Sequence, residues 1–214
     1  LDTLTKAIEA SGHRAGEDVF ISLDIAANEL GDASGYSLAL DDGRLTSEAM
    51  AARIIEWAGR YPILSIEDPA GQDDWTAMAA VTSAIGDRVQ IIGDDVLVTN
   101  AERVARAGDA GVCNAALIKV NQVGTVTEAK AALDAAVERG WGAIVSARSG
   151  ESEDVTIAHL ATGWDAGQLK VGSFTRSERM AKWNEMLRIE EAMGADAVFA
   201  GFSAFAGSIG RVAA

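Results

Sequence analysis

The sequence predicts an α/β fold in which parallel strands alternate with helices. Two observations lead to this prediction: short runs rich in Ile, Val and Leu recur along the 214 residues, and a longer helical pattern follows each run. The runs mostly lack the alternation of apolar and polar residues that is typical of a strand with one solvated face. We therefore expect strands that are buried on both faces and joined by right-handed helical crossovers.

Six strands are expected from the apolar runs. All of them are short, and each ends close to a charged residue. Their ranges are 19–26, 61–68, 89–96, 116–120, 142–148 and 168–172.

One helix is expected before the first strand and one after each strand. The segment 47–60 places Met50, Ile54 and Trp57 on one face and stops just before Pro62, which cannot continue a helix. The expected ranges are 1–12, 47–60, 72–85, 100–108, 125–138, 152–162 and 176–193.

The helix at 125–138 has the clearest sequence signals. Thr125 and Glu128 form a T-x-x-E capping box at its start, and Gly140 follows its end. We expect Val126, Leu133 and Val137 to form the apolar stripe of this helix.

Charged residues at the strand ends favour a barrel over an open sheet. A charge within an apolar strand costs several kcal/mol unless it is paired or bound to a metal, so a recurrence at successive strands indicates a site. Strand ends converge on one point only if the sheet curls, as in a TIM-type (β/α) barrel. Such a barrel usually takes about 250 residues, so six βα units out of eight predict an incomplete barrel. The charged residues are Asp24, Glu67, Asp68, Asp94, Asp95, Lys119, Arg148 and Lys170.

Three carboxylates come from consecutive strands. Asp24, Glu67 and Asp94 would repel one another without a cation, and together they form an all-oxygen site suited to Mg²⁺. Asp68 and Asp95 are expected to point away from this site, because neighbouring positions of a strand face opposite sides.

Three basic residues follow from the next three strands. Burial and neighbouring cations such as Lys170 would lower the pKa of Lys119 and suit it to act as a general base. Arg148 can bind a carboxylate or a phosphate with two hydrogen bonds. Together, the three carboxylates and the three basic residues indicate proton abstraction next to a metal-bound carboxylate, with Lys170 stabilising the negative charge that develops.

Composition restricts the partners of the protein. A formal net charge of −14 disfavours binding of nucleic acid or anionic lipid by bulk charge, so an anionic substrate needs local cations. Cys113 is the only cysteine, which excludes an intramolecular disulfide and fits a cytoplasmic protein with this residue in its core. No apolar run approaches the roughly 20 residues that span a bilayer, and the first residues do not form a signal peptide.

The motifs around these charges resemble the enolase family, whose members interconvert 2-phosphoglycerate and phosphoenolpyruvate. The likeness covers about residues 1–202, and the motifs occur in the family's order. They are Leu23-Asp24-Ile25-Ala26-Ala27-Asn28-Glu29, Ser65-Ile66-Glu67-Asp68-Pro69, Gly93-Asp94-Asp95, Leu117-Ile118-Lys119-Val120-Asn121-Gln122, Arg148-Ser149-Gly150-Glu151, Gly167-Gln168-Leu169-Lys170 and Arg176-Ser177-Glu178-Arg179.

The resemblance implies a role for each matching position. It implies that the carboxylates bind Mg²⁺, that Lys119 removes the proton alpha to the substrate carboxylate, and that Arg148, Ser149 and Lys170 bind the substrate, a small anionic phospho-acid. It also implies a cytoplasmic, glycolytic lyase that forms a homodimer. The implied magnesium ligands are Asp24, Glu67 and Asp94.

The sequence departs from the family pattern in two places. Ala147 stands where enolases usually have a histidine before Arg148, and the chain departs from the family after Gly201. We expect a barrel portion at 1–200 and a Gly/Ala-rich tail at 201–214. The family's N-terminal capping domain, its first barrel strands and the glutamate that assists departure of the hydroxyl group are expected upstream of Leu1.

Three functions remain open at this point. The first is the enolase reaction itself. The second is an enolase-like reaction on a different phospho- or phosphono-acid, because Ala147 can neither donate a side-chain hydrogen bond nor titrate. The third is a non-catalytic enolase-like protein that binds a ligand or partner.

Overall fold

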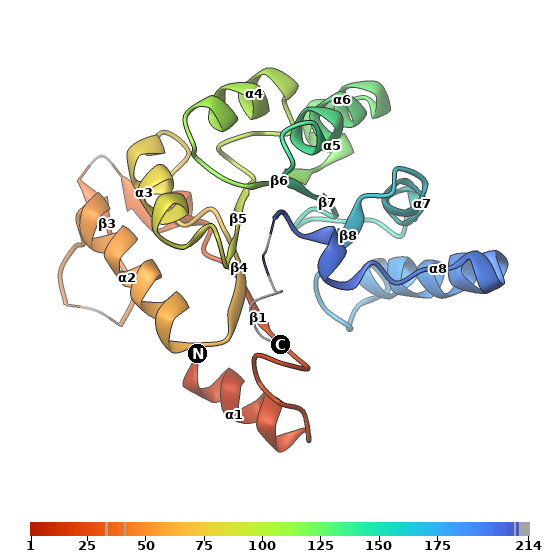
Figure 1. Ribbon diagram of the computed structural model, residues 1–214, viewed down its shortest axis with the longest axis horizontal. Coiled ribbons are helices and arrows are strands. Elements are labelled where there is room, and N and C mark those ends of the chain that lie inside the picture. Colours follow the sequence, from red (N-terminus) through yellow and green to blue (C-terminus); the bar gives the residue numbers. More distant parts are fainter. Residues whose placement is uncertain (33, 41, 208, 210–214) are drawn as a thin grey trace.

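The fold is a curved parallel sheet with helices on its outer face. The computed structural model describes residues 1–32, 34–40, 42–207 and 209. Its sheet has the order β1-β4-β5-β6-β7-β8, so neighbouring strands follow one another along the chain and all pairs are parallel. The strands form an arc with the helices outside it (Figure 1). The predicted α/β fold, an incomplete TIM-type barrel with six of its eight βα units, is confirmed.

Each strand of the sheet lies within, or within one residue of, its predicted range. The central strands β5, β6 and β7 are buried along their whole length, whereas β8 at the edge has no fully buried residue. The bounds are β1 Ile21–Asp24, β4 Ile63–Glu67, β5 Gln90–Gly93, β6 Ala115–Ile118, β7 Gly142–Ser146 and β8 Gly167–Lys170.

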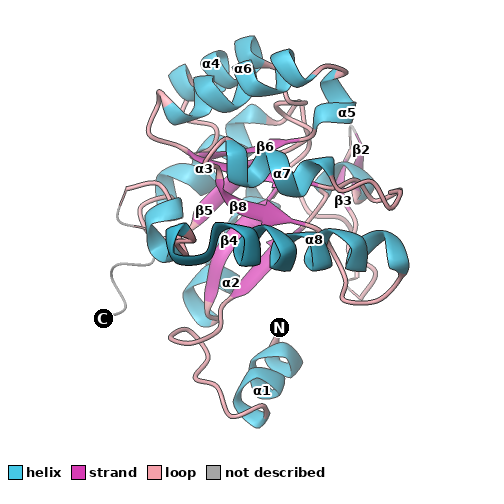
Figure 2. Cartoon of the chain, turned by 90° about the vertical axis from the view of Figure 1, so that its right-hand side faces the viewer, coloured by secondary structure: helices cyan, strands magenta, loops and turns pink. Residues whose placement is uncertain are grey.

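The predicted helices also form. Each of the helices that follow a strand packs outside the sheet, and α1 lies apart from them with no buried residue (Figures 1 and 2). The bounds are α1 Asp2–Ala10, α2 Ser47–Arg60, α3 Trp75–Ile85, α4 Ala101–Asp109, α6 Val126–Val137, α7 Thr156–Gly163 and α8 Ser177–Met193. Among the described residues, no helix is long and apolar enough to cross a membrane.

Side-chain caps fix the starts of four helices. Thr46, Asp74 and Asn100 each accept a hydrogen bond from a backbone N–H in the first turn of α2, α3 and α4, respectively. Thr125 caps α6 as predicted: its hydroxyl accepts from the Glu128 N–H at 3.1 Å and donates to the Glu128 carboxylate at 2.6 Å.

The apolar stripe of α6 differs from the prediction. Leu133 is buried, but Val126 and Val137 are about half exposed. Their places in the core are taken by small residues, because α6 lies close to β6, β7 and α4. The buried residues of α6 are Ala129, Ala132, Leu133 and Ala136.

The buried apolar side chains of the described residues form two clusters, one on each face of the sheet. The larger cluster lies between the sheet and the helices. The smaller cluster lies inside the arc and consists of Ile92, Ala115, Leu117 and Ile144.

Besides the 3₁₀ turns that follow α8, three short features among the described residues were not predicted. They are the 3₁₀ turn η1 (Ala27–Glu29), the hairpin of β2 (Gly31–Asp32) with β3 (Gly35–Tyr36), and α5 (Val120–Val123). All of them are too short for a periodic pattern. The first two belong to the long connection between β1 and α2, and α5 begins directly after Lys119.

The segment that follows α8 lies across the open side of the arc. Gln168 at the start of β8 donates a hydrogen bond to the carbonyl of Ala204 at 2.9 Å, and Phe202 packs edge to face on Phe20, just before β1. This segment includes the 3₁₀ turns η2 (Gly194–Asp196) and η3 (Gly201–Ala204) and is dark blue in Figure 1. Of the predicted tail at 201–214, residues 208 and 210–214 lie outside the described residues.

Candidate functional site

A cavity of about 470 Å³ lies at the carboxyl ends of the strands. Its acidic residues come from the loops and strand ends of β1, β4 and β5, and its basic residues from those of β6, β7 and β8 and from the first turn of α8. Because the strands are ordered along the arc, one half of the cavity is acidic and the other half is basic. The acidic residues are Asp24, Glu29, Asp68, Asp94 and Asp95, and the basic ones are Lys119, Arg148, Lys170, Arg176 and Arg179.

Lys170 connects the two ends of the arc. Asp24 and Glu67 are the last residues of β1 and β4 and are paired in the sheet register. Lys170, the last residue of β8, donates to the Asp24 carboxylate at 2.8 Å and to the Glu67 carboxylate at 2.6 Å. The three predicted site residues are therefore in direct contact across the open side of the sheet.

The Glu67 carboxylate is strongly affected by its surroundings. Burial raises its pKa to about 7, and the opposing effect of Lys170 is further offset by the negative charges of Asp24 and Asp94. Burial alone would lower the pKa of Lys170, but the Glu67 and Asp24 carboxylates raise it. These carboxylates thus form a place where a positive charge is stabilised.

A second ion pair joins the acidic and basic halves. Asp94 directly follows β5, Lys119 directly follows β6, and the Lys119 ammonium contacts Asp94 Oδ2. Both side chains are about nine-tenths buried. The other oxygen, Asp94 Oδ1, is buried and has no hydrogen-bond partner among the described residues. A buried, unpaired carboxylate oxygen is a candidate ligand for a metal ion or a substrate group.

The prediction that Asp68 and Asp95 point away from the predicted metal site is wrong, because both line the cavity together with Asp24 and Asp94. One carboxylate oxygen of each of Asp68, Asp94 and Asp95 lies within 4.8 Å of the others, so the cluster could hold a metal ion. The rule of alternating faces fails here because β4 ends at Glu67 and β5 at Gly93, and Asp68 has a positive φ of 41°.

The Asp68 carboxylate also organises the backbone after β5. Its two oxygens accept hydrogen bonds from the N–H groups of Asp94 and Asp95, both at 2.9 Å. Burial raises the pKa of Asp68 to about 7, although these two hydrogen bonds act in the opposite direction. Asp68 therefore has two roles: it belongs to the acidic cluster, and it positions the backbone of Asp94.

Asn28 is a residue of this site that the sequence reasoning missed. Its side-chain amide donates to the Asp95 carboxylate at 2.6 Å, and its oxygen accepts from the Gln72 N–H at 2.9 Å. It thereby joins the loops after β1, β4 and β5. The available signal was its place in the Ala-Ala-Asn-Glu motif that follows Asp24.

The basic half of the cavity is built by the loops after β7 and β8. Ala147, Arg148 and Ser149 all line it, and Arg148 Nη1 donates to the Asn121 side chain at 3.4 Å. The N–H of Ala147 donates to the carbonyl of Lys170 at 2.9 Å, so this buried methyl group lies beside the end of β8.

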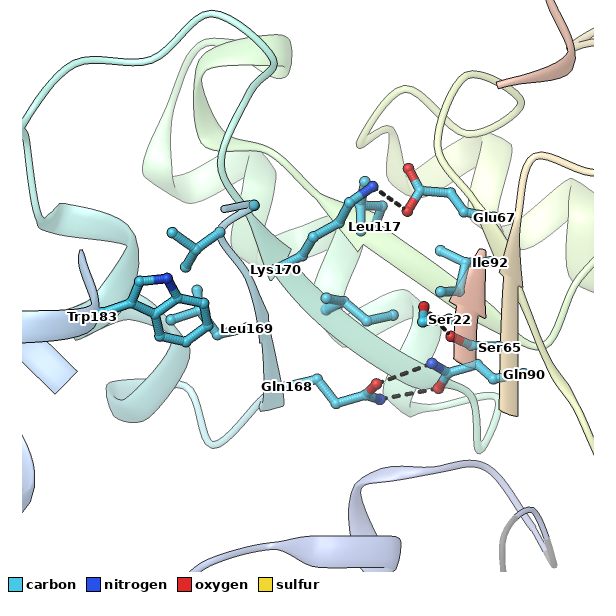
Figure 3. A pocket seen from close by; sticks show the side chains of 13 residues that line it. Ser22, Ser65, Glu67, Gln90, Ile92, Leu117, Gln168, Leu169, Lys170 and Trp183 are labelled. Atoms are coloured by element: carbon cyan, nitrogen blue, oxygen red, sulfur yellow. Dashed lines mark hydrogen bonds and ion pairs between the residues drawn. The ribbon is translucent and has the colours of Figure 1, made fainter. Parts of the chain in front are cut away.

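A second cavity of about 340 Å³ lies inside the arc and is lined mainly by residues of the strands (Figure 3). Glu67 and Lys170 line this cavity and point toward one another. Six of the seven predicted site residues line the first cavity, and the seventh, Glu67, is linked to it through Lys170. The predicted residues are Asp24, Glu67, Asp94, Lys119, Arg148, Ser149 and Lys170.

Residues 1–207 match the family described as enolase, C-terminal TIM barrel domain. This chain belongs to the enolase family. Membership explains why charged residues from successive strands meet at one cavity, since the carboxyl ends of barrel strands carry the active site in this architecture. The match extends through the segment after α8 that lies across the open side of the arc, and so continues beyond Gly201, after which a departure from the family was expected.

The donors in the enolase-family site fit a hard divalent cation. All candidate ligands are carboxylate oxygens, which Mg²⁺ and similar ions prefer. Asp94 offers a buried oxygen that has no hydrogen-bond partner in the described part of the chain, and the ammonium groups of Lys119 and Lys170 already lie among the carboxylates.

Proposed function

We propose that this chain is the barrel portion of an Mg²⁺-dependent hydro-lyase of the enolase type, which converts 2-phosphoglycerate to phosphoenolpyruvate in glycolysis. The observation that carries the proposal is the division of one cavity into an acidic and a basic half, with Lys119 at the boundary. Membership of the enolase family supports the reaction class.

Asp24, Glu67 and Asp94 are the proposed magnesium ligands. The electrostatic coupling of Glu67 to both aspartates supports this set, and so does Asp94 Oδ1, which is buried and accepts no hydrogen bond from the residues that the structure describes. A bound Mg²⁺ would supply charge stabilisation for the substrate carboxylate. Asp68 is the less suitable ligand, because both of its oxygens already accept backbone hydrogen bonds.

Lys119 is the proposed general base. An ammonium group has no lone pair, so Lys119 must leave its ion pair with Asp94 and lose a proton before it can act. It then takes the proton from the carbon alpha to the substrate carboxylate. The electron pair of that C–H bond forms the carbon–carbon double bond as the hydroxyl group on the next carbon leaves as water. The leaving hydroxyl group also needs a proton from an acid, which the enolase resemblance implies is a glutamate.

Arg148, Ser149 and Lys170 are the proposed substrate-binding residues. The Arg148 guanidinium and the Ser149 hydroxyl suit a phosphate group, and Lys170 suits the carboxylate region. The local cations of this half of the cavity explain how a chain of net charge −14 attracts an anionic phospho-acid. The same net charge disfavours nucleic acid as a partner.

The test measures turnover of 2-phosphoglycerate by the full-length protein in the presence of Mg²⁺. The absorbance of the product phosphoenolpyruvate reports the rate. We expect turnover that is lost when a chelator removes the metal. Absence of turnover at high enzyme concentration would contradict the proposal.

Ala147 supports a second candidate, an enolase-like reaction on a different phospho- or phosphono-acid. The residue is buried at the wall of the cavity and carries no group that can hydrogen-bond through its side chain. If Ala147 determines the substrate, Ala147→His should raise activity on 2-phosphoglycerate. An unchanged rate would remove Ala147 as the specificity determinant. Tight binding of phospho-acids without turnover of any of them would favour the third candidate, a non-catalytic binding protein.

The proposal includes a homodimer in the cytoplasm, as the resemblance implies. Light scattering on the full-length protein at micromolar concentration should give twice the mass of one chain. A monomer mass under these conditions would contradict the dimer.

A further inference from the structure

Two buried basic side chains of α8 contact the loop that carries Arg148 and Ser149. Arg179 is only 5% exposed and Lys182 only 1% exposed. They are three positions apart and therefore lie on one face of the helix. Basic residues are rarely fully buried unless they are paired, so their hydrogen-bond partners indicate what they do.

The guanidinium of Arg179 binds three backbone carbonyls. Nη1 donates to the carbonyl of Arg148 at 2.8 Å and to that of Val171 at 2.8 Å, and Nη2 donates to the carbonyl of Ser149 at 2.8 Å. These carbonyls belong to the ends of two neighbouring βα units. The planar, branched guanidinium can reach all three at once, which a single ammonium group cannot do with the same geometry.

Lys182 holds the next part of the same loop. Its ammonium donates to the carbonyl of Ser152 and lies 3.6 Å from the Glu151 carboxylate. Glu151 in turn accepts hydrogen bonds from the N–H of Arg148 at 3.2 Å and from the N–H of Ser152 at 2.9 Å. Residues 148–152 are thus tied to α8 at both ends and closed on themselves by one carboxylate.

The loop depends on these polar contacts for its conformation. None of residues 148–154 is buried, so no apolar side chain of this stretch is packed into the core. Loops without buried apolar contacts open easily unless hydrogen bonds hold them.

We propose that Arg179 and Lys182 are positioning residues, which fix residues 148–152 so that Arg148 and Ser149 face the phosphate of the substrate. The inference rests on the proposed function, because it assigns the role of these two residues to the same site. Arg179 also lines the cavity and adds a fixed positive charge to its basic half.

The principal experiment compares Arg179→Gln and Arg179→Lys with two control variants in the full-length protein. Arg188→Gln removes one positive charge from the same helix, at an exposed side chain that pairs with Glu185. Val104→Ala lowers stability through a buried position on α4, outside both cavities.

Arg179→Gln should raise the KM for 2-phosphoglycerate by about 10- to 100-fold while kcat falls much less, since a small misplacement of a binding group weakens binding first. Arg179→Lys should recover part of the loss because it keeps the charge and some of the hydrogen bonds. Arg188→Gln and Val104→Ala should leave KM unchanged. Lys182→Met should produce a smaller rise in KM than Arg179→Gln, because it loosens the loop farther from Arg148.

Hydrogen exchange of the amides of residues 148–152 gives a readout that does not depend on turnover. Arg179→Gln should increase their exchange rate, and Arg188→Gln should not. An unchanged exchange rate in Arg179→Gln would overturn the positioning role. An unchanged KM in Arg179→Gln would overturn it as well, provided that this variant is no less stable than Val104→Ala.

The two proposals can fail separately. If the wild-type protein does not turn over 2-phosphoglycerate, the proposed reaction is wrong. In that case the dissociation constant for inorganic phosphate, measured by calorimetry, replaces KM as the readout. Arg179→Gln should weaken phosphate binding about tenfold relative to Arg188→Gln. Equal phosphate affinity in the two variants, with equal exchange rates, would overturn the inference whatever the reaction is.

Discussion

The side-chain amides of Gln90 and Gln168 hydrogen-bond to each other across the interior of the arc, with both N···O distances at 3.0 Å (Figure 3). Gln90 is the first residue of β5 and Gln168 lies on β8, and these strands are not neighbours in the sheet. The pair therefore helps to hold the curvature that brings the strand ends together.

This pair gives a prediction for stability. Gln90→Leu leaves the Gln168 amide without its buried partner and should lower the free energy of unfolding by about 1–3 kcal/mol. The double variant Gln90→Leu/Gln168→Leu should lose less than the sum of the single variants, because neither polar group is then left unpaired. Urea unfolding of the four proteins measures the coupling. Strict additivity would show that the two amides contribute independently.

The metal ligands can be distinguished by substitution. Mg²⁺ should raise the thermal midpoint of unfolding of the full-length protein by several degrees, since it binds only the folded state. Asp94→Asn should abolish this shift, Glu67→Gln should reduce it strongly, and Asp95→Asn should reduce it little. Calorimetric titration with Mg²⁺ provides a second measurement. The control is Asp134→Asn, which changes an exposed carboxylate on α6 paired with Lys130. If Asp95→Asn reduces the Mg²⁺-induced shift more than Glu67→Gln does, the metal is bound by Asp68, Asp94 and Asp95 instead.

Lys119 gives a prediction for catalysis. Lys119→Met keeps the length of the side chain and removes the amine, so turnover should fall by about 10²- to 10⁴-fold. Exchange of the substrate α-proton with deuterated solvent should fall in parallel, as observed by NMR. Lys130→Met removes an amine from the exposed Lys130–Asp134 pair and should leave both rates unchanged. Persistent α-proton exchange in Lys119→Met would require a different base.

Asp68 gives a prediction for the backbone after β5. Asp68→Asn places an amide group opposite one of the two N–H donors, so one hydrogen bond is lost and the variant should be less stable by about 1–3 kcal/mol. Chemical unfolding measures this loss. Asp109→Asn is the matched control, because its side chain is 80% exposed and its ion pair with Arg139 is long at 3.4 Å. Equal stability of the two variants would show that Asp68 is not needed to position Asp94.

Cys113 gives a prediction for chemical reactivity. Burial raises the pKa of its thiol, so the thiolate that reacts with alkylating agents is scarce at neutral pH. The folded protein should therefore react with iodoacetamide far more slowly than the protein in urea. Rapid alkylation of the folded form would contradict the buried position.

The strand ends were predictable because a charge at the end of an apolar run stands out in the sequence. Asp24, Glu67, Lys119 and Lys170 all lie at or next to such ends. The contacts between them were not predictable in detail. Asp68 was expected to face away, but its positive φ turns the chain at a point that strand alternation does not describe.

The hydrogen-bond partners of Arg179 and Asn28 could not be predicted from the sequence either. Arg179 and Asn28 lie in motifs that were noted, yet their partners come from loops distant in the chain. The stripe on α6 failed for a related reason, since the space available at the sheet admits Ala132 and Ala136 and leaves Val137 outside.

The hydrogen bond from Lys170 to Asp24 joins side chains 146 residues apart in the chain, and that from Lys170 to Glu67 joins side chains 103 residues apart. Closing contacts of such long sequence separation costs loop entropy, which the rest of the fold must offset. The carboxylates at the ends of β1 and β4 therefore have this ammonium group beside them only when β8, the last strand in the sheet order, has joined the sheet. A chain cut before Lys170 would lack the positive charge that both carboxylates contact.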